Sequence, residues 1–227
     1  MYRLIIFFVF IPLVSATAAD GNAILKERCS SCHDLNGPAA QTVKELWNRK
    51  APDLFYAGSK YKKEWLESWL QKPTRIRPAG YHYFQHIKPG KKRDVVDKST
   101  LKPHLTLTSN EAKKVTDVLM AKEAKENLVK QGDFKGGSIS LSFGEMVFDK
   151  FNGCTGCHEI EPNFGGSSGP EVYTAAQRLQ EDYMVSFIRN PQAWNPKSIM
   201  PNKHTAEANI QKLVQYMIAL SKENWNE

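Results

Sequence analysis

Apolar side chains recur at helical spacing at two places in the chain. Each place has four apolar residues at positions i, i+1, i+4 and i+5, which lie on one face of an α-helix. The first set is Trp65, Leu66, Trp69 and Leu70, and the second is Tyr183, Met184, Phe187 and Ile188. The pattern predicts one core-facing helix in each half of the chain.

The two predicted helices belong to a longer repeat. Pro52 and Pro73 are separated by 21 residues, as are Pro170 and Pro191, and the apolar positions between them align without a gap. Repetition in register favours a duplicated domain over two unrelated core helices. The first Pro of each pair is followed by an acidic and an aliphatic residue, Asp53-Leu54 and Glu171-Val172.

Further helices are predicted on both sides of each repeat. Short amphipathic helices are expected over 20–28 and 142–151, the second opened by a capping box of Ser142 and Glu145. Closing helices are expected over 110–128, opened by Thr108 and Glu111, and over 206–221, opened by Thr205. Residues 130–140 hold three Gly without apolar periodicity, which is typical of a linker. The predicted fold class is all-α, with one small domain over 20–129 and another over 141–227.

The first 19 residues have the layout of a secretory signal peptide. Arg3 supplies a positive start, 4–14 is an apolar run, and small residues over 15–19 fit cleavage after Ala18 or Ala19. The apolar run is shorter than the roughly 20 residues that span a bilayer, and no later segment is apolar enough to do so. The sequence therefore predicts export to the periplasm and no integral membrane span.

Composition and charge indicate which kind of macromolecule the protein would bind. The chain has 227 residues, 41% of them apolar, and a formal net charge of +7, which falls to +6 without Arg3. The apolar fraction is near the globular average, and a positive surface favours acidic protein partners. Nucleic acid is a poor partner, because an exported protein rarely meets it and no basic run alternates with aromatic side chains.

The four Cys carry the strongest chemical signal. They lie in two motifs of identical spacing, Cys29-Ser30-Ser31-Cys32-His33 and Cys154-Thr155-Gly156-Cys157-His158. This is the Cys-x-x-Cys-His motif of covalent haem attachment, in which the His ligates the iron. Two disulfides would need no His in either motif, and a zinc ribbon would place its second Cys pair about 15–20 residues after the first. The motifs predict two c-type haems, bound through Cys29, Cys32, Cys154 and Cys157, with His33 and His158 as iron ligands.

These residues give each half a resemblance to a class I cytochrome c domain. Together the halves, over about 20–222, resemble the tandem dihaem cytochromes c. The resemblance implies two helical domains that each wrap one haem, with haem edges exposed to redox partners. It also implies Met as the usual sixth iron ligand, on a loop just before the last helix. Met200, followed by Pro201 and nine residues past Pro191, matches that position in the second half.

The first half departs from the family pattern. Its only Met after the motif is Met120, inside the predicted closing helix, and His82 stands nine residues past Pro73 where the repeat expects Met. About twenty extra residues, 83–102, follow and carry His86. An alignment read backward from the closing helix instead places Lys102 at the ligand position, with His104 beside it. We expect a nitrogenous sixth ligand, with His82 first, then His104, His86 and Lys102, and an open site as the remaining possibility.

The resemblance implies a one-electron carrier, or an electron-transfer subunit, between a donor enzyme and an acceptor oxidase or cytochrome. Because a thioether ligand favours ferrous iron, the first haem is expected to have the lower potential. The rival hypothesis is a dihaem oxidoreductase, peroxidase-like or thiosulfate-oxidising, with a displaceable ligand at the first haem. A third is a fixed subunit of a respiratory complex that is held through the 83–102 insertion. No phosphate-binding loop, pair of catalytic acids or activated nucleophile is recognised.

Overall fold

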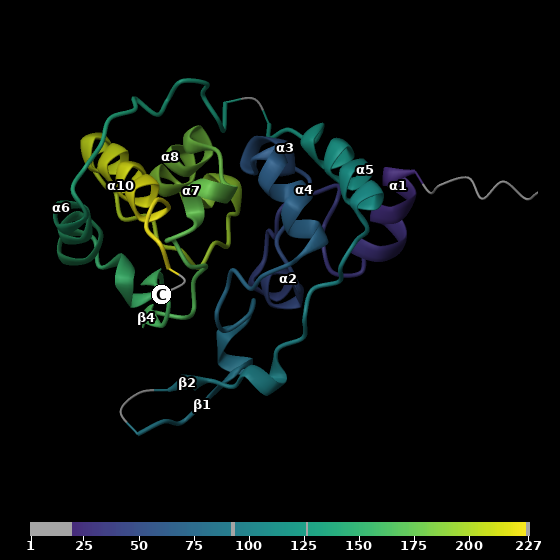
Figure 1. Ribbon diagram of the computed structural model, residues 1–227, viewed down its shortest axis with the longest axis horizontal. Helices are drawn as coiled ribbons and strands as arrows, with labels where there is room; N and C mark the ends of the chain where they lie inside the picture. The colour runs from purple at the N-terminus through teal and green to yellow at the C-terminus, as the bar shows by residue number, and fades with distance from the viewer. Residues whose placement is uncertain (1–19, 92–93, 126, 226–227) are drawn as a thin grey trace, which may run out of the picture.

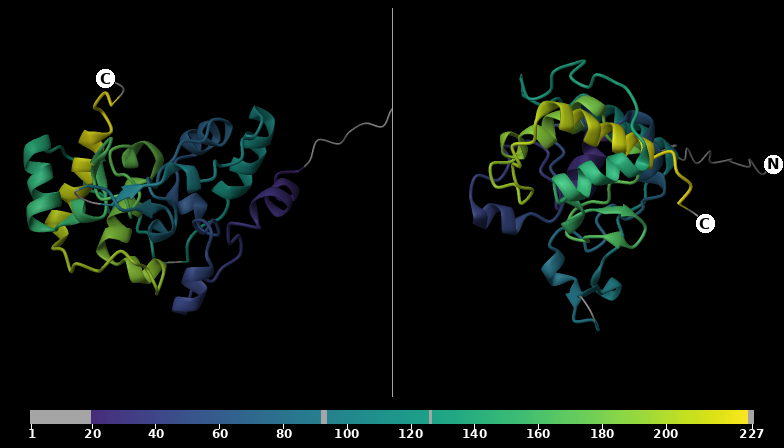
Figure 2. Two further views of the ribbon diagram at one scale, coloured as in Figure 1. Left: turned by 90° about the horizontal axis from the view of Figure 1, so that it is seen from below. Right: turned by 90° about the vertical axis from the view of Figure 1, so that its left-hand side faces the viewer.

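The protein is described by a computed structural model over residues 20–91, 94–125 and 127–225. Two mostly helical lobes lie side by side, one from each half of the chain (Figures 1 and 2). The predicted signal peptide lies outside the described residues. Within the described residues, no helix has both the length and the apolar character that crossing a membrane requires.

The first lobe packs its helices around one core. It contains α1 (Gly21–Ile24), which continues as the wider turn η1 (Leu25–Cys29), then α2 (Val43–Asn48), α3 (Ala57–Lys60), α4 (Lys63–Gln71) and α5 (Ser109–Met120). Helix α5 crosses both α1 and α4. Gly21 permits the first crossing, since a Cβ there would stand 2.4 Å from the carbonyl oxygen of Lys114. The core includes Leu25, Leu66, Leu70, Val115 and Leu119.

The second lobe has a similar order of elements. It contains α6 (Leu141–Glu145), η4 (Met146–Phe151), η5 (Cys154–Gly156), α7 (Ala175–Arg178), α8 (Glu181–Arg189), α9 (Pro191–Trp194) and α10 (Glu207–Leu220). A short antiparallel pair, β3 (Glu159–Glu161) and β4 (Phe164–Gly165), follows the second Cys motif. Gly144 of α6 meets Tyr216 of α10 closely, as Gly21 meets α5 in the first lobe.

The insertion forms a separate projection on the first lobe. It comprises η2 (Tyr83–Gln85), the hairpin strands β1 (Ile87–Lys88) and β2 (Val95–Val96), and η3 (Lys98–Thr100). Figure 1 shows the hairpin extending below both lobes. Within the part of the chain that the structure describes, no corresponding element lies between α9 and α10.

The two predicted core helices are confirmed as α4 and α8. Leu66 and Leu70 are buried in the first lobe, and Tyr183 and Met184 in the second. Aromatic rings also stack on one another along one side of each helix. The stacks are Tyr61–Trp65–Trp69 and Tyr183–Phe187.

Two predicted helix starts are wrong. The N-cap before α6 is Ser140, whose hydroxyl accepts from the Phe143 amide, so the expected Ser142–Glu145 capping box is not the start of that helix. Thr205 does not cap α10, because its hydroxyl donates to Asn152 Oδ1 at 3.0 Å. The capping box of Thr108 and Glu111 before α5 is confirmed.

Helix α5 ends at Met120, eight residues before the predicted end. The chain leaves the helix because the next residues bond to α3. The Lys122 carbonyl accepts from the Gly58 amide at 2.8 Å, and the Ala124 amide donates to Ser59 Oγ at 2.9 Å. These contacts replace the helical hydrogen bonds that the sequence pattern suggested.

The 130–140 segment has no helix or strand, as a linker should, yet it is fastened to the second lobe. The amides of Gly132 and Phe134 donate to the Asp182 carboxylate at the start of α8, each at 2.8 Å. Asp133 pairs with Arg189 at 2.6 Å. The segment is therefore part of the second lobe's surface.

Equivalent residues of the two repeats meet where the lobes touch. The Lys62 amide donates to the Arg178 carbonyl and the Gln180 amide to the Lys60 carbonyl, both at 3.0 Å. Gln180 occupies the repeat position of Lys62, and Arg178 that of Lys60. Pairing of equivalent positions in antiparallel orientation is the relation that an approximate twofold axis produces.

Candidate haem sites

Both Cys motifs adopt the same tight turn. The amides of Cys32 and His33 donate to the Cys29 carbonyl, and those of Cys157 and His158 donate to the Cys154 carbonyl, at 2.9–3.1 Å. The turn brings both thiols and the imidazole of each motif to one place. All four Cys are free thiols, with Cys32 and Cys157 exposed. The thiols are thus available for covalent attachment and do not form the two disulfides considered as an alternative.

The two motif His residues are held in the same way. His33 Nδ1 donates to the Pro52 carbonyl and His158 Nδ1 to the Pro170 carbonyl, both at 2.7 Å. This fixes the tautomer and leaves Nε2 as the metal-binding nitrogen. Burial lowers the pKa of both imidazoles, so both are neutral, as metal coordination requires. The role of the two Pro carbonyls was not predicted, although the repeated Pro-acid-aliphatic triplets were its sequence signal.

The Met200 loop lies beside the second Cys motif. Burial raises the pKa of Cys154 to about 11, and the charge of Lys203 opposes the rise. The bond from Thr205 to Asn152 joins the same loop to the end of η4. Gln192 Nε2 donates to the Met200 carbonyl at 2.9 Å and fixes the loop from the α9 side.

Gly169 lies against the His158 ring. A Cβ at this position would stand 2.7 Å from both Cε1 and Nδ1 of that imidazole. Only glycine fits there without displacing the ring. The loop that precedes Pro170 therefore supports the imidazole from behind.

His104 faces His33 in the first lobe. The centres of the two rings are 6.1 Å apart, and the Nδ1 of His104 donates to the Leu105 carbonyl at 2.8 Å. Its Nε2 is therefore the nitrogen left for a metal. An iron held by both rings would be bound through His33 Nε2 and His104 Nε2, and neutral imidazole nitrogens are ordinary ligands of haem iron. The donor set thus fits a haem between these two rings.

His82 is engaged elsewhere. Its Nε2 donates to the Arg49 carbonyl at 2.7 Å, and its ring contacts Trp47 of α2 and Phe84 of η2. Its Nδ1 is buried and has no hydrogen-bond partner among the described residues. His82 joins the insertion to the loop around α2. This arrangement favours His104, which the sequence placed second to His82.

Of the other two candidates, His86 has a side-chain partner, and Lys102 is exposed. His86 Nδ1 bonds to Thr100 Oγ1 at 2.8 Å within the insertion. The Lys102 carbonyl accepts from Arg75 at 2.9 Å. Among the described residues, His104 is the candidate whose ring lies against His33.

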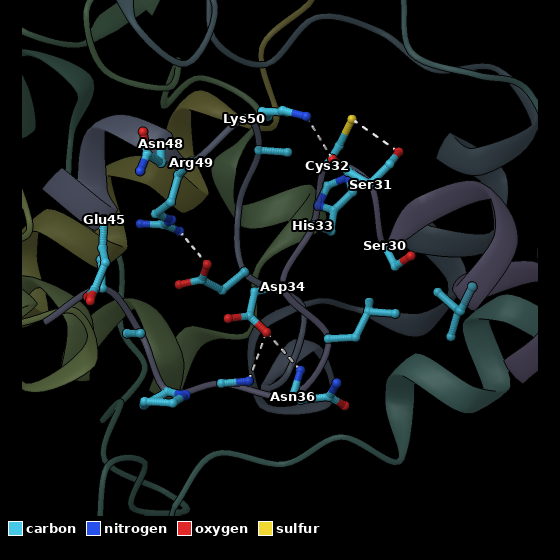
Figure 3. Close-up of a pocket in the computed structure, with 18 of the residues that line it drawn as sticks. Ser30, Ser31, Cys32, His33, Asp34, Asn36, Glu45, Asn48, Arg49 and Lys50 are labelled. Atoms are coloured by element: carbon cyan, nitrogen blue, oxygen red, sulfur yellow. Dashed lines mark hydrogen bonds and ion pairs between the residues drawn. The ribbon is translucent and has the colours of Figure 1, made fainter.

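The first lobe has a longer loop behind its motif His. His33 is 19 residues from the Pro that holds it, whereas His158 is 12 residues from its Pro. The longer loop carries α2 and surrounds an open cavity of about 970 Å³ that borders Cys32 and His33 (Figure 3). In Figure 3, Lys50 points toward Ser31, to whose carbonyl it donates at 3.2 Å. The cavity wall is polar and apolar in about equal measure, and the cavity opens to solvent beside the first Cys motif.

Comparison with known families gives one match, and it lies in the second lobe. Residues 141–217 match the family model of cytochrome c oxidase, cbb3-type, subunit III. No curated protein and no solved structure shows a significant match to the chain. The matched region is a cytochrome c domain, which implies a covalently bound c-type haem and electron transfer through it. The chain therefore contains a cytochrome c domain that comprises most of its second lobe.

Proposed function

We propose that the protein is an exported dihaem c-type cytochrome that passes single electrons between redox partner proteins. The observation that carries the proposal is the equivalent geometry of the two motifs. In each, the second Cys and the His bond to the first Cys carbonyl, and the His Nδ1 donates to a Pro carbonyl. One of these motifs lies in the matched cytochrome c domain. The other supports a second haem at Cys29, Cys32 and His33.

The two sites have different proposed axial ligands. His158 and Met200 would hold the second iron, and His33 and His104 the first. When bound, each haem stores and releases one electron as its iron alternates between the ferric and ferrous states. The thioether of Met200 favours ferrous iron more than the imidazole of His104 does. With these ligands the first haem would have the lower potential, so electrons would enter there and leave through the second.

The partner surface proposed for the first lobe is basic. Residues 83–102 carry six Lys or Arg and two Asp. This surplus suits an acidic donor protein at the projecting hairpin.

The proposed export to the periplasm rests on the pattern of the first 19 residues.

A redox titration with each haem assigned tests the electron-transfer proposal. Low-temperature electron paramagnetic resonance would assign one His/Met centre and one His/His centre, and the His/His centre should titrate at the lower potential. Equal potentials, or the reverse order, would contradict the proposed direction of transfer.

The oxidoreductase alternative is favoured by one feature, the insertion over 83–102, which supplies elements of the first lobe between α4 and α5. Such an enzyme would need a displaceable ligand at the first haem, where a small molecule could bind. Cyanide and carbon monoxide binding separate the hypotheses, because an electron carrier should retain two six-coordinate spectra after either addition. A rapid spectral change at the first haem would favour the enzyme.

A further inference from the structure

Residues 76–79 of the first lobe pack against the loop that supports His158, the motif ligand of the second haem site. The Ile76 carbonyl accepts from the Glu171 amide at 2.8 Å, and the Ala79 amide donates to the Ser167 carbonyl at 3.3 Å. Between them, Arg77 Nη1 donates to the Ser168 carbonyl at 2.8 Å. Ser168 precedes Gly169, the residue that lies against the His158 ring. Arg77 therefore brings a cation from one lobe to the support of the other lobe's imidazole.

The charge of Arg77 is not neutralised by a carboxylate. Its two cationic neighbours are both paired, Arg49 with Asp53 at 2.8 Å and Arg178 with Glu171 at 3.4 Å. Across the ranges that the structure describes, no carboxylate lies within ion-pair distance of Arg77. Its guanidinium instead lies 5.3 Å from the centre of the Tyr81 ring. An arginine remains charged in such surroundings, because its pKa is too high for deprotonation.

The field of this cation reaches the second site more than the first. Arg77 bonds to Ser168, and the next residue, Gly169, lies against the His158 ring. The groups in contact with the His33 imidazole are instead the His104 ring and the Pro52 carbonyl. Oxidation adds one positive charge to a haem iron, and a nearby uncompensated cation makes that addition less favourable. The reduction potential of the nearby haem is then higher.

We propose that Arg77, supplied by the first lobe, raises the reduction potential of the haem held at His158. This inference rests on the proposed electron-transfer function. If it is correct, the contact between the lobes increases the difference in reduction potential that drives electrons from the first haem to the second. A haem propionate paired with Arg77 would leave the sign unchanged, since loss of Arg77 would then expose the negative charge of the propionate. Arg77 is thus a residue that tunes potential through the protein's electrostatics and touches no reacting atom.

The test is a redox titration of the holoprotein carrying Arg77→Gln, Arg77→Lys or Arg75→Gln. Arg75 is a matched control, because it also donates to a carbonyl, that of Lys102, but at an exposed position. We expect Arg77→Gln to lower the potential of the His/Met haem, with a smaller shift at the first haem. Arg77→Lys should restore most of the potential, and Arg75→Gln should change neither haem. An unchanged second potential in Arg77→Gln, or an equal fall in Arg77→Lys, would overturn the proposal.

A second variant separates charge from loosened packing. Glu171→Gln removes the negative partner of Arg178 at the same contact and should raise the second potential, the opposite sign to Arg77→Gln. Arg77→Gln removes a side-chain bond between the lobes, and Glu171→Gln removes bonds to Thr174 and Arg178 beside it. Both variants loosen local packing, so a fall in both potentials would reject the electrostatic explanation. The mass of each variant gives its haem count independently. Protein without haem at Cys154 and Cys157 would contradict the proposed function, whereas correct loading with unshifted potentials would contradict only the role of Arg77.

Discussion

His33 and His158 each donate to a Pro carbonyl, and this shared contact is the smallest unit on which the two-haem proposal depends. The motif is local, so five consecutive residues were enough to predict it. The sixth ligand of the first haem was harder to predict, because two alignments of the insertion gave different residues. The structure favours His104 through one long-range contact, the 6.1 Å separation from His33, which no local pattern encodes.

Replacing His104 by Met should raise the potential of the first haem. A thioether favours ferrous iron, and axial ligands tune haem potentials over about 0.8 V, so a rise on the order of 0.1 V is expected. Redox titration of His104→Met measures the shift. His82→Met is the control and should leave the potential and the spectrum of the first haem nearly unchanged. A shift in the control alone would return the ligand role to His82.

At the scale of elements, hydrophobic periodicity predicted α4 and α8 well, and helix ends poorly. The ends depend on contacts with other elements, such as the bond from Ala124 to Ser59 that accompanies the end of α5. Caps were ambiguous where several Ser residues precede a helix, as at Ser140 and Ser142. In each case several residues could have ended or capped the helix. Contacts with other elements determine which one does, and the sequence pattern does not contain those contacts.

The cap of α6 can be tested directly. Ser140→Ala removes the hydroxyl that accepts from the Phe143 amide and should lower the free energy of unfolding by about 1 kcal/mol. Ser142→Ala is the matched control and should change it little. Urea denaturation of both variants measures the difference. A larger loss in Ser142→Ala would restore the capping box that the sequence predicted.

The attachment of the 130–140 segment should depend on pH. Hydrogen bonding to Arg189 holds the pKa of Asp133 below its usual value in the folded protein. Its stabilisation is therefore present above the unfolded pKa of about 4 and is lost as the pH falls through the lowered folded value. Asp133→Asn should cost about 1 kcal/mol at pH 7, since Arg189 is partly exposed, and almost nothing in acid. Denaturation at several pH values checks this, and an equal cost at every pH would contradict it.

At the scale of the whole molecule, the lobes meet through equivalent repeat positions, as the paired Lys62 and Gln180 segments show. The repeat itself was visible in the sequence. The contact was not, because it is formed at helix ends, as by Lys60 and Arg178, and in irregular segments, as by Arg77, where apolar periodicity gives no signal. The family match covers the second lobe, so the account of the first lobe depends on the geometry that the two halves share.

The central claim, that two haems are covalently fixed to one chain, is tested most directly by intact mass under denaturing conditions. The protein should be made in cells competent for haem attachment. We expect the mass of the processed chain plus two haems, and plus one haem for either Cys29→Ala/Cys32→Ala or Cys154→Ala/Cys157→Ala. A wild-type mass with one haem, or with amino acids alone, would contradict it.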